Sequence, residues 1–266
     1  MKYNTIKPTK RLSDIVRFYW MLEGSVPTER PYIHRTLANA SPELIFHYKG
    51  PFEELNATDK PEKTFLTGVH AQTNKVRRFT AKSDFGIFGV FLQPYAIPVL
   101  FGIPSSEIKN ELPDLVTLLG QDGKDLTEKM ILAENNNQRL NIINQFFEQR
   151  LTQFDRPEIV NATRLIYHSH GFVNVKKLAE QSCLSQRQFE RKFKEHIGFS
   201  PKSFARVVRF NALLWNYQRK DKTLTDIAYD FGYYDQAHFI QDFKQFSGYN
   251  PKTYFSGNAS EVFYAP

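Results

Sequence analysis

A repeat near the C-terminal end restricts the fold of this chain more than any other sequence feature. Residues 178–204 align with residues 227–254, and matching or similar residues recur 50 positions apart. A seventh pair, Ala179 and Ala228, is 49 apart, so the second copy contains one extra residue. Two copies are too few for a solenoid, so the repeat predicts a paired module. The six pairs at the 50-residue spacing are Phe189/Phe239, Phe193/Phe243, Lys194/Lys244, Gly198/Gly248, Pro201/Pro251 and Phe204/Tyr254.

The first copy contains the start and stop signals of three helices. A short helix is expected over residues 175–182, and Ser185 with Gln188 forms a capping box for a second helix. Gly198 ends that helix as a left-handed cap, and Ser200-Pro201 begins the third. The buried stripe of the second helix is expected to be Phe189, Phe193 and Ile197.

The second copy repeats these signals with other residues. Thr223 and Asp226 start its short helix, Gly232 ends that helix, Asp235 starts the next, and Gly248 closes it. Its stripe is Phe239, Phe243 and Phe246, and Asn250-Pro251 begins a last helix. Residues 202–219 between the copies predict one helix of roughly 27 Å. Such a rod can hold two helix-turn-helix units about one DNA turn apart, roughly 34 Å.

The faces opposite the two phenylalanine stripes are candidates for DNA contact, because a helix of this size fits the major groove. The first face is Gln186, Arg187, Glu190, Arg191 and Lys194, where bases outnumber the single acid. The second face is Gln236, Ala237, His238, Gln241 and Lys244. This second face is nearly neutral, and Asp242 is expected to repel a nearby DNA phosphate. The first copy is therefore expected to make most of the sequence-specific contacts.

Net charge supports a nucleic-acid partner for the repeat. The chain carries +7 overall, of which +6 lies between residues 155 and 255, with 16 Lys/Arg against 10 Asp/Glu. A charge excess of this size is also compatible with a merely solvated surface.

The repeat resembles the DNA-binding domain of the AraC/XylS family of transcription regulators over about residues 160–255. The resemblance implies base contacts from Gln186, Arg187, Glu190 and Arg191, and from Gln236, Ala237, His238 and Gln241. Asn250 departs from the usual Ser or Thr but caps equally well. The residues that carry it are Ile227-Ala228, Gly232-Tyr233, Phe239, Phe243-Lys244, Gly248, Pro251 and Tyr254.

The N-terminal half predicts short strands followed by helices. Strands are expected at residues 16–23, 44–48, 64–66, 75–80 and 86–92, which suggests a small sandwich or barrel. Helices are expected at residues 96–101, 105–109, 115–119, 126–132 and 140–151. The stretches SPELIFH (41–47), FGVFLQP (88–94) and LFGIP (100–104) are similar to a cupin-like sensor domain found in some AraC/XylS members.

Polar residues among these strands are candidates for lining a ligand pocket. They are His34, Arg35, Glu43, His47 and His70, and the alternative is that they are ordinary surface or core residues. No two of these histidines have a spacing that places both on one face of a strand or helix, so no metal site is expected. The single cysteine, Cys183, lies in the repeat, where a packing role is expected.

The expected fold class is therefore α+β with two domains. Residues 1–152 should form a β-rich barrel or cupin-like domain, with following helices, for ligand sensing or dimerisation. Residues 157–256 should form an all-α domain with two tandem helix-turn-helix motifs joined by a linker helix. The expected function is sequence-specific transcription regulation, with no cofactor and no catalytic residues. The alternative is a DNA-binding domain fused to an enzymatic or partner-binding module.

The expected partners are double-stranded DNA, RNA polymerase, a small-molecule effector and a second copy of the chain. The lack of a long apolar run, of a signal sequence and of a second cysteine predicts a cytoplasmic protein that does not span a membrane.

Overall fold

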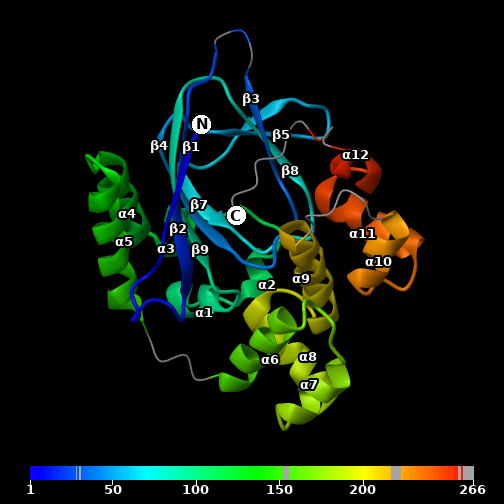
Figure 1. Cartoon of the computed structure of the whole chain (residues 1–266). Coiled ribbons are helices and arrows are strands. Elements are labelled where there is room, and N and C mark those ends of the chain that lie inside the picture. The colour runs from blue at the N-terminus through cyan, green and yellow to red at the C-terminus, as the bar shows by residue number, and fades with distance from the viewer. Residues whose placement is uncertain (28, 30, 152–155, 217–222, 257–258, 260–266) are drawn as a thin grey trace.

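Strands occupy the first third of the chain and helices the rest (Figure 1). The computed structural model describes all residues except 28, 30, 152–155, 217–222, 257–258 and 260–266, and it leaves out the side chains of residues 215 and 216. The strands are β1 (Lys2–Ile6), β2 (Val16–Gly24), β3 (Tyr32–Thr36), β4 (Glu43–Lys49), β5 (Glu53–Leu55), β6 (Pro61–Lys63), β7 (Thr67–His70), β8 (Arg77–Ala81) and β9 (Phe85–Leu92). The helices are α1 (Ala96–Phe101), α2 (Ser105–Ile108), α3 (Leu115–Leu119), α4 (Gln121–Leu132), α5 (Asn136–Arg150), α6 (Pro157–His168), α7 (Val175–Gln181), α8 (Gln186–Ile197), α9 (Pro201–Asn216), α10 (Leu224–Asp230), α11 (Gln236–Ser247) and α12 (Pro251–Phe255).

The strands form two facing sheets rather than a closed barrel, so of the two expected architectures, a sandwich or a barrel, the structure shows the sandwich. One sheet has the order β1-β2-β9-β4-β7 and the other β3-β8-β5-β6. Closure would require edge strands of one sheet to pair with those of the other. Instead, apolar side chains from both sheets, including Ile45, Phe79 and Phe85, pack in the space between the two layers. The N-terminal half is therefore a two-sheet structure.

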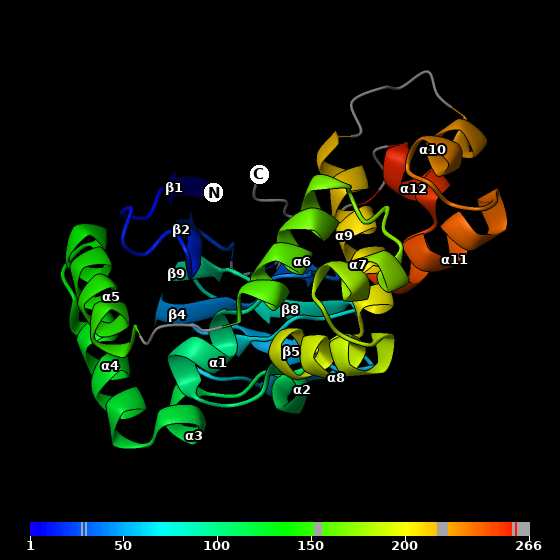
Figure 2. The ribbon, with the colours of Figure 1, turned by 90° about the horizontal axis from the view of Figure 1, so that it is seen from below.

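Both faces of the five-stranded sheet are covered, which explains why its central strand β9 lacks a polar face. In β9, every residue except Phe91 is buried. One face of the sheet packs against the other sheet, and the opposite face packs against α1 and α3–α5 through Phe88, Val90 and Leu92. Figure 2 shows α4 and α5 on the side of the sheet away from the C-terminal helices.

The strand boundaries differ from the expected ones where the sequence pattern is short. Residues 64–66 lie between β6 and β7 and are not a strand, so that prediction is wrong. The strands β1, β3, β5, β6 and β7 were not expected, because each has only three to five residues, and only β7 among them contains buried residues. The longer strands β2, β4, β8 and β9 lie where the sequence places them.

Helices α6 to α12 form the predicted double helix-turn-helix unit. Ser185 and Gln188 make the predicted capping box at α8, and Thr223 with Asp226 makes one at α10. Gly198 and Gly248 end α8 and α11 in the left-handed conformation, with φ of 87° and 73°. The linker helix α9 ends at residue 216, and the last part of its expected range lies outside the described residues.

The core of this unit is built from the two predicted phenylalanine stripes and from α9. Cys183 does not join it. Its φ of 54° places it in the tight turn between α7 and α8, where its side chain is exposed, while Leu184 packs against the core. The expected packing role for Cys183 is therefore wrong.

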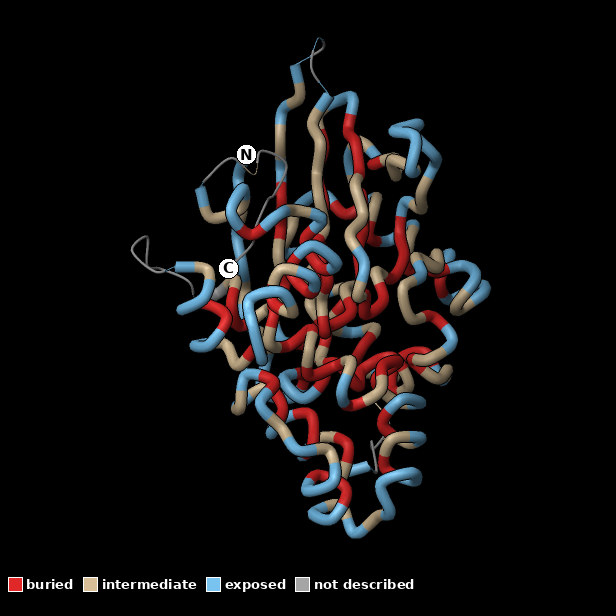
Figure 3. The backbone as a smooth tube through the Cα atoms, turned by 90° about the vertical axis from the view of Figure 1, so that its right-hand side faces the viewer, coloured by how far each residue is buried: buried red, intermediate tan, exposed pale blue. Residues whose placement is uncertain are grey.

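A short segment of the N-terminal half is part of the C-terminal core. The docking segment, residues 37–41, contributes Leu37, Ala38 and Ala40 to the same apolar cluster as α8, α9 and α11. Buried chain accordingly continues from the strands into the helices in Figure 3. The backbone N–H of Ala38 donates to the carbonyl of Phe246 at 2.8 Å, which joins the docking segment to the end of α11.

Side chains of α6 and α9 also hold the docking segment. Asn211 donates to the carbonyl of Ala38 at 2.9 Å and accepts from the N–H of Ala40 at 3.3 Å. The hydroxyls of Ser41 and Tyr167 lie 3.0 Å apart. The docking segment therefore contacts α6, the linker helix α9 and the end of α11.

Candidate functional site

The α8 face, which is Gln186, Arg187, Glu190, Arg191 and Lys194, lies on the surface of the first helix-turn-helix unit. All of these side chains are exposed except that of Glu190, which is half-buried. The opposite side of α8 is fully buried at Phe189, Phe193 and Ile197. Gln186 donates to Glu190 at 2.8 Å, so the single acid is engaged within the face while the bases project outward.

The α11 face, which is Gln236, Ala237, His238, Gln241 and Lys244, is exposed except at His238. His238 is half-buried and makes an edge contact with Tyr233, with ring centroids 5.4 Å apart. The structure therefore places both predicted faces on the surface of the two recognition helices.

Asp242 does not lie on the α11 face, and the expectation that it opposes a phosphate is wrong. Its side chain is 1% exposed, and Arg206 of α9 donates to it from Nη2 at 2.5 Å and from Nε at 3.2 Å. A paired, buried carboxylate adds little negative potential to the surface. Asp242 instead joins α11 to α9.

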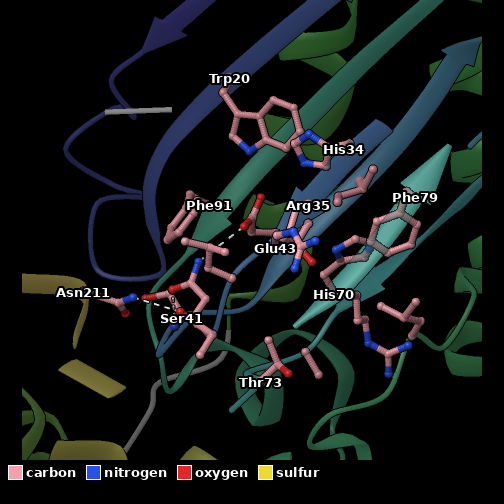
Figure 4. A pocket seen from close by; sticks show the side chains of 18 of the residues that line it. Trp20, His34, Arg35, Ser41, Glu43, His70, Thr73, Phe79, Phe91 and Asn211 are labelled. Carbon is pink, nitrogen blue, oxygen red and sulfur yellow. Dashed lines mark hydrogen bonds between the residues drawn. The ribbon is translucent and has the colours of Figure 1, made fainter. Parts of the chain in front are cut away.

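A cavity of about 390 Å³ lies between the two sheets and extends to α6 and α9. Figure 4 shows its polar and aromatic side chains, with Glu43 near the centre and Trp20, His34, His70 and Phe79 around it. Asn211 and Tyr167 line its helical side. The five residues predicted as ligand-binding all line this one cavity: His34, Arg35, Glu43, His47 and His70. Their role in binding stays a prediction.

The three cavity histidines are held in the neutral form. Burial lowers the pKa of His34 and of His47 to about 4, and that of His70 to about 3. Aromatic rings pack against them: His70 stacks on Phe79 with centroids 5.3 Å apart, and His47 lies 5.2 Å from Phe52. Near neutral pH these imidazoles therefore add hydrogen-bonding groups to the wall without adding charge.

The carboxyl group of Glu43 lies in the cavity wall, where few polar contacts offset the cost of its burial. Burial raises the pKa of Glu43 to about 7, and the polar groups of Trp20 and Asn39 offset only part of that rise. Asn39 Nδ2 donates to it at 3.4 Å, a long hydrogen bond. No ion pair to Glu43 occurs among the residues that the structure describes.

Trp20 lies across β9 because the opposite residue is Gly89. The two are register partners in the sheet. A Cβ at residue 89 would come within 2.0 Å of the Trp20 indole, so any larger residue would displace the ring. Gly89 therefore gives the cavity a flat aromatic wall.

Three cavity residues with structural roles were not predicted as site residues: Trp20, Tyr167 and Asn211. Asn211 could have been found, since it is a polar residue within the apolar stripe of α9. Trp20 and Tyr167 are aromatic residues in apolar patterns, and nothing in such patterns separates a cavity wall from a packed core.

Among the described residues, no group of three or more His, Cys, Asp or Glu side chains is arranged to hold a metal ion. None of the described helices has the length and apolar character that a membrane crossing requires.

Comparison with known families decides the nature of the C-terminal unit. A family described as a helix-turn-helix domain matches residues 178–257. The C-terminal unit is thus an AraC-type helix-turn-helix domain, as the resemblance predicted. A second family, described as a domain of unknown function (DUF6597), matches residues 4–114, which include the last part of β1 and all of β2 to β9. The AraC-type domain thus follows an N-terminal domain whose family has no assigned role.

Individual relatives match from about a third to about two thirds of the chain. An uncharacterized HTH-type transcriptional regulator of Haemophilus influenzae is 32% identical over 81 residues, which is 30% of this chain and 27% of that protein. This chain therefore matches about a quarter of the length of that relative. The probable transcriptional regulator LumQ of Photobacterium leiognathi is 20% identical over 196 residues, covering 70% of this chain and 78% of LumQ. Among solved structures, ToxT from Vibrio cholerae has 11% identity and a TM-score of 0.44, over 97% of this chain and 98% of ToxT.

Proposed function

We propose that this chain is a sequence-specific DNA-binding transcription regulator. The observation that carries the proposal is the α8 face, where Arg187, Arg191 and Lys194 are exposed opposite a fully buried stripe on a helix-turn-helix recognition helix. Arginine can contact guanine O6 and N7 together, and glutamine can contact adenine N6 and N7. The names of the relatives, which are transcriptional regulators, agree with it.

In this proposal α8 and α11 enter successive major grooves, with α9 as the spacer between them. The basic α8 face supplies most of the specificity and the α11 face aligns the second unit. The buried pairing of Asp242 with Arg206 supports a contribution from α11, because it removes a negative charge from that surface.

We assign DNA binding to residues 157–256 and effector sensing to residues 1–152. The lining of the cavity supports a coupled arrangement, because its walls come from both parts of the chain. A bound effector would touch α6 and α9 directly and would lie beside the docking segment. RNA polymerase and a second copy of the chain are further partners that the family resemblance implies.

An N-terminal enzyme fused to the DNA-binding unit is the weaker alternative. An alkyl-transfer repair module would need a reactive cysteine in the first half, and the only cysteine in the sequence is Cys183. The names of the relatives also favour a regulator.

Selection of binding sites from a random DNA library tests the proposal. We expect one sequence to be enriched, and the full chain should bind it at least 1,000-fold more tightly than a scrambled duplex, about the lower end for specific regulators. Affinity should fall as salt rises, because phosphate contacts release counterions. Equal affinity for the two duplexes would refute sequence-specific regulation.

A further inference from the structure

Glu43 is an acidic side chain of the cavity wall whose charge no cationic side chain balances among the residues that the structure describes. Glu43 has a long hydrogen bond from Asn39 at 3.4 Å and no ion pair in the described part of the chain. A buried carboxylate without a cation is unfavourable, and such groups cluster at binding sites. A ligand with a positive charge would provide the cation that pairs with the Glu43 carboxylate.

The second observation is an unpartnered imidazole nitrogen in the same wall. His47 is 7% exposed, and its Nδ1 has no hydrogen-bond partner within the described part of the chain. It lies on the same strand and face as Glu43, four residues along β4. A neutral imidazole nitrogen can accept a hydrogen bond, so His47 offers a second acceptor for a ligand N–H group.

The remaining wall is aromatic, which suits a cation with an apolar body. Trp20, Phe79 and Phe91 line the cavity around Glu43 (Figure 4). Phe91 stacks on Phe18 with ring centroids 4.8 Å apart, so that part of the wall is fixed. Faces of aromatic rings attract ammonium groups, most strongly where water is excluded.

The arginines that line the cavity are engaged in other contacts, which argues against an anionic ligand. Arg77 pairs with Glu54 at 2.6 Å. Arg17 donates to Ser41 at 3.0 Å and lies over the ring of Tyr167. The guanidinium carbon of Arg35 lies 4.3 Å from the ring centroid of Tyr249, toward the end of α11.

We propose that the cavity binds a protonated amine with an apolar body, and that its ammonium group pairs with Glu43. The proposal deepens the proposed function and rests on it, since it names the chemical class of the effector. His47 Nδ1 accepts a second ammonium hydrogen, and the aromatic wall encloses the body of the ligand.

The same carboxyl group is linked to the DNA-binding unit by a short path. Asn39, its hydrogen-bond partner, belongs to the docking segment, and Asn39 Oδ1 accepts from the N–H of Ser41 at 3.1 Å. The Ser41 hydroxyl in turn contacts Tyr167 of α6. An ammonium group at Glu43 competes with Asn39 for the carboxylate, and so it acts on the segment that holds α6, α9 and α11.

Calorimetric titration of the full chain tests the ligand class. The probes are phenethylamine, tyramine and cyclohexylmethylamine, with 3-phenylpropanoate and 2-phenylethanol as the anionic and neutral matches. We expect at least one amine to bind about tenfold or more tightly than both matched compounds. Tighter binding of 3-phenylpropanoate, equal binding of all the probes, or no binding by any amine would overturn the proposal.

Two variants show whether Glu43 provides the site. Glu43→Gln keeps the size of the side chain and removes its charge, and it should weaken amine binding at least about tenfold. Glu128→Gln changes an exposed acid of α4 outside the cavity and should bind amines as the unchanged protein does. Circular dichroism confirms that both variants are folded. Unchanged amine affinity in Glu43→Gln would overturn the assignment.

A DNA-binding measurement on the same preparations separates this proposal from the proposed function. If the amine class is wrong, the chain still binds its selected DNA site specifically. If the regulator function is wrong, specific DNA binding is absent whatever the cavity binds.

Discussion

Replacing Glu43 with Gln should change how stability depends on pH, in a direction that the structure determines. Burial raises the pKa of Glu43 from its ordinary value of 4.5 to about 7. Between these two pH values the folded chain keeps a proton on Glu43 that the unfolded chain has lost. The stabilisation from this proton is therefore complete below pH 4.5 and is lost as pH rises toward 7.

The size of the effect follows from the pKa rise. One pKa unit corresponds to about 1.4 kcal/mol, so the full rise corresponds to about 3 kcal/mol. We expect the folding stability of the unchanged chain to fall by about 2 kcal/mol between pH 5 and pH 8. This is less than the full amount because Glu43 is only half-buried and the range begins above pH 4.5. Glutamine does not ionise, so Glu43→Gln should gain about 2 kcal/mol relative to the unchanged chain over that range.

Urea unfolding of both proteins, followed by circular dichroism at pH 5, 6, 7 and 8, measures this difference. His34, His47 and His70 have lowered pKa values, so their contribution is lost as pH falls through about 6.5 toward 4. Both proteins contain these histidines, and their contribution cancels in the comparison. Parallel stability curves for the two proteins would show that Glu43 ionises normally and would refute the electrostatic description of the cavity.

Three other substitutions test the remaining parts of the structure. Arg191→Ala should cost about 1–3 kcal/mol of DNA binding and relax sequence preference at one base pair in a gel-shift series, whereas uniform weakening across sequences would make Arg191 a phosphate contact. Gly248→Val should destabilise the chain by about 1–3 kcal/mol in urea unfolding, since φ is 73° and a Cβ would lie 2.5 Å from Arg35 Nη1; an unchanged midpoint would contradict the left-handed cap. Asn211→Ala removes the side-chain partners of the carbonyl of Ala38 and of the N–H of Ala40, and it should lower the local stability of the docking segment by about 1–3 kcal/mol. Amide hydrogen exchange in residues 37–41 should become faster, and unchanged exchange would contradict this role of Asn211.

Local signals were enough to predict the double helix-turn-helix unit. Capping residues such as Ser185 and Thr223, the phenylalanine stripes and the glycine caps act within a few residues of one another. Their effect on the chain is therefore almost independent of distant contacts. The basic composition of the α8 face could be predicted for the same reason, because burial of one side of a helix determines which residues are exposed.

Sequence patterns were less informative about the sheets, where contacts between distant segments decide the structure. A strand buried on both faces, as β9 is, shows no alternation, and short edge strands such as β1 show little pattern of any kind. Whether the strands close into a barrel depends on pairing between edges that are far apart in the sequence, and no local feature specifies it.

The sequence by itself determined the helix-turn-helix repeat, its exposed basic face and a set of polar candidates in the first half of the chain. Only the tertiary structure brought His34, Glu43, His47 and His70 into one cavity, since they come from strands β3, β4 and β7 of two sheets. It also placed Asn211 of α9 beside the docking segment, whose Ala40 is 171 residues earlier in the chain. Helices follow from interactions between near neighbours, whereas a cavity depends on side chains that only the folded chain brings together.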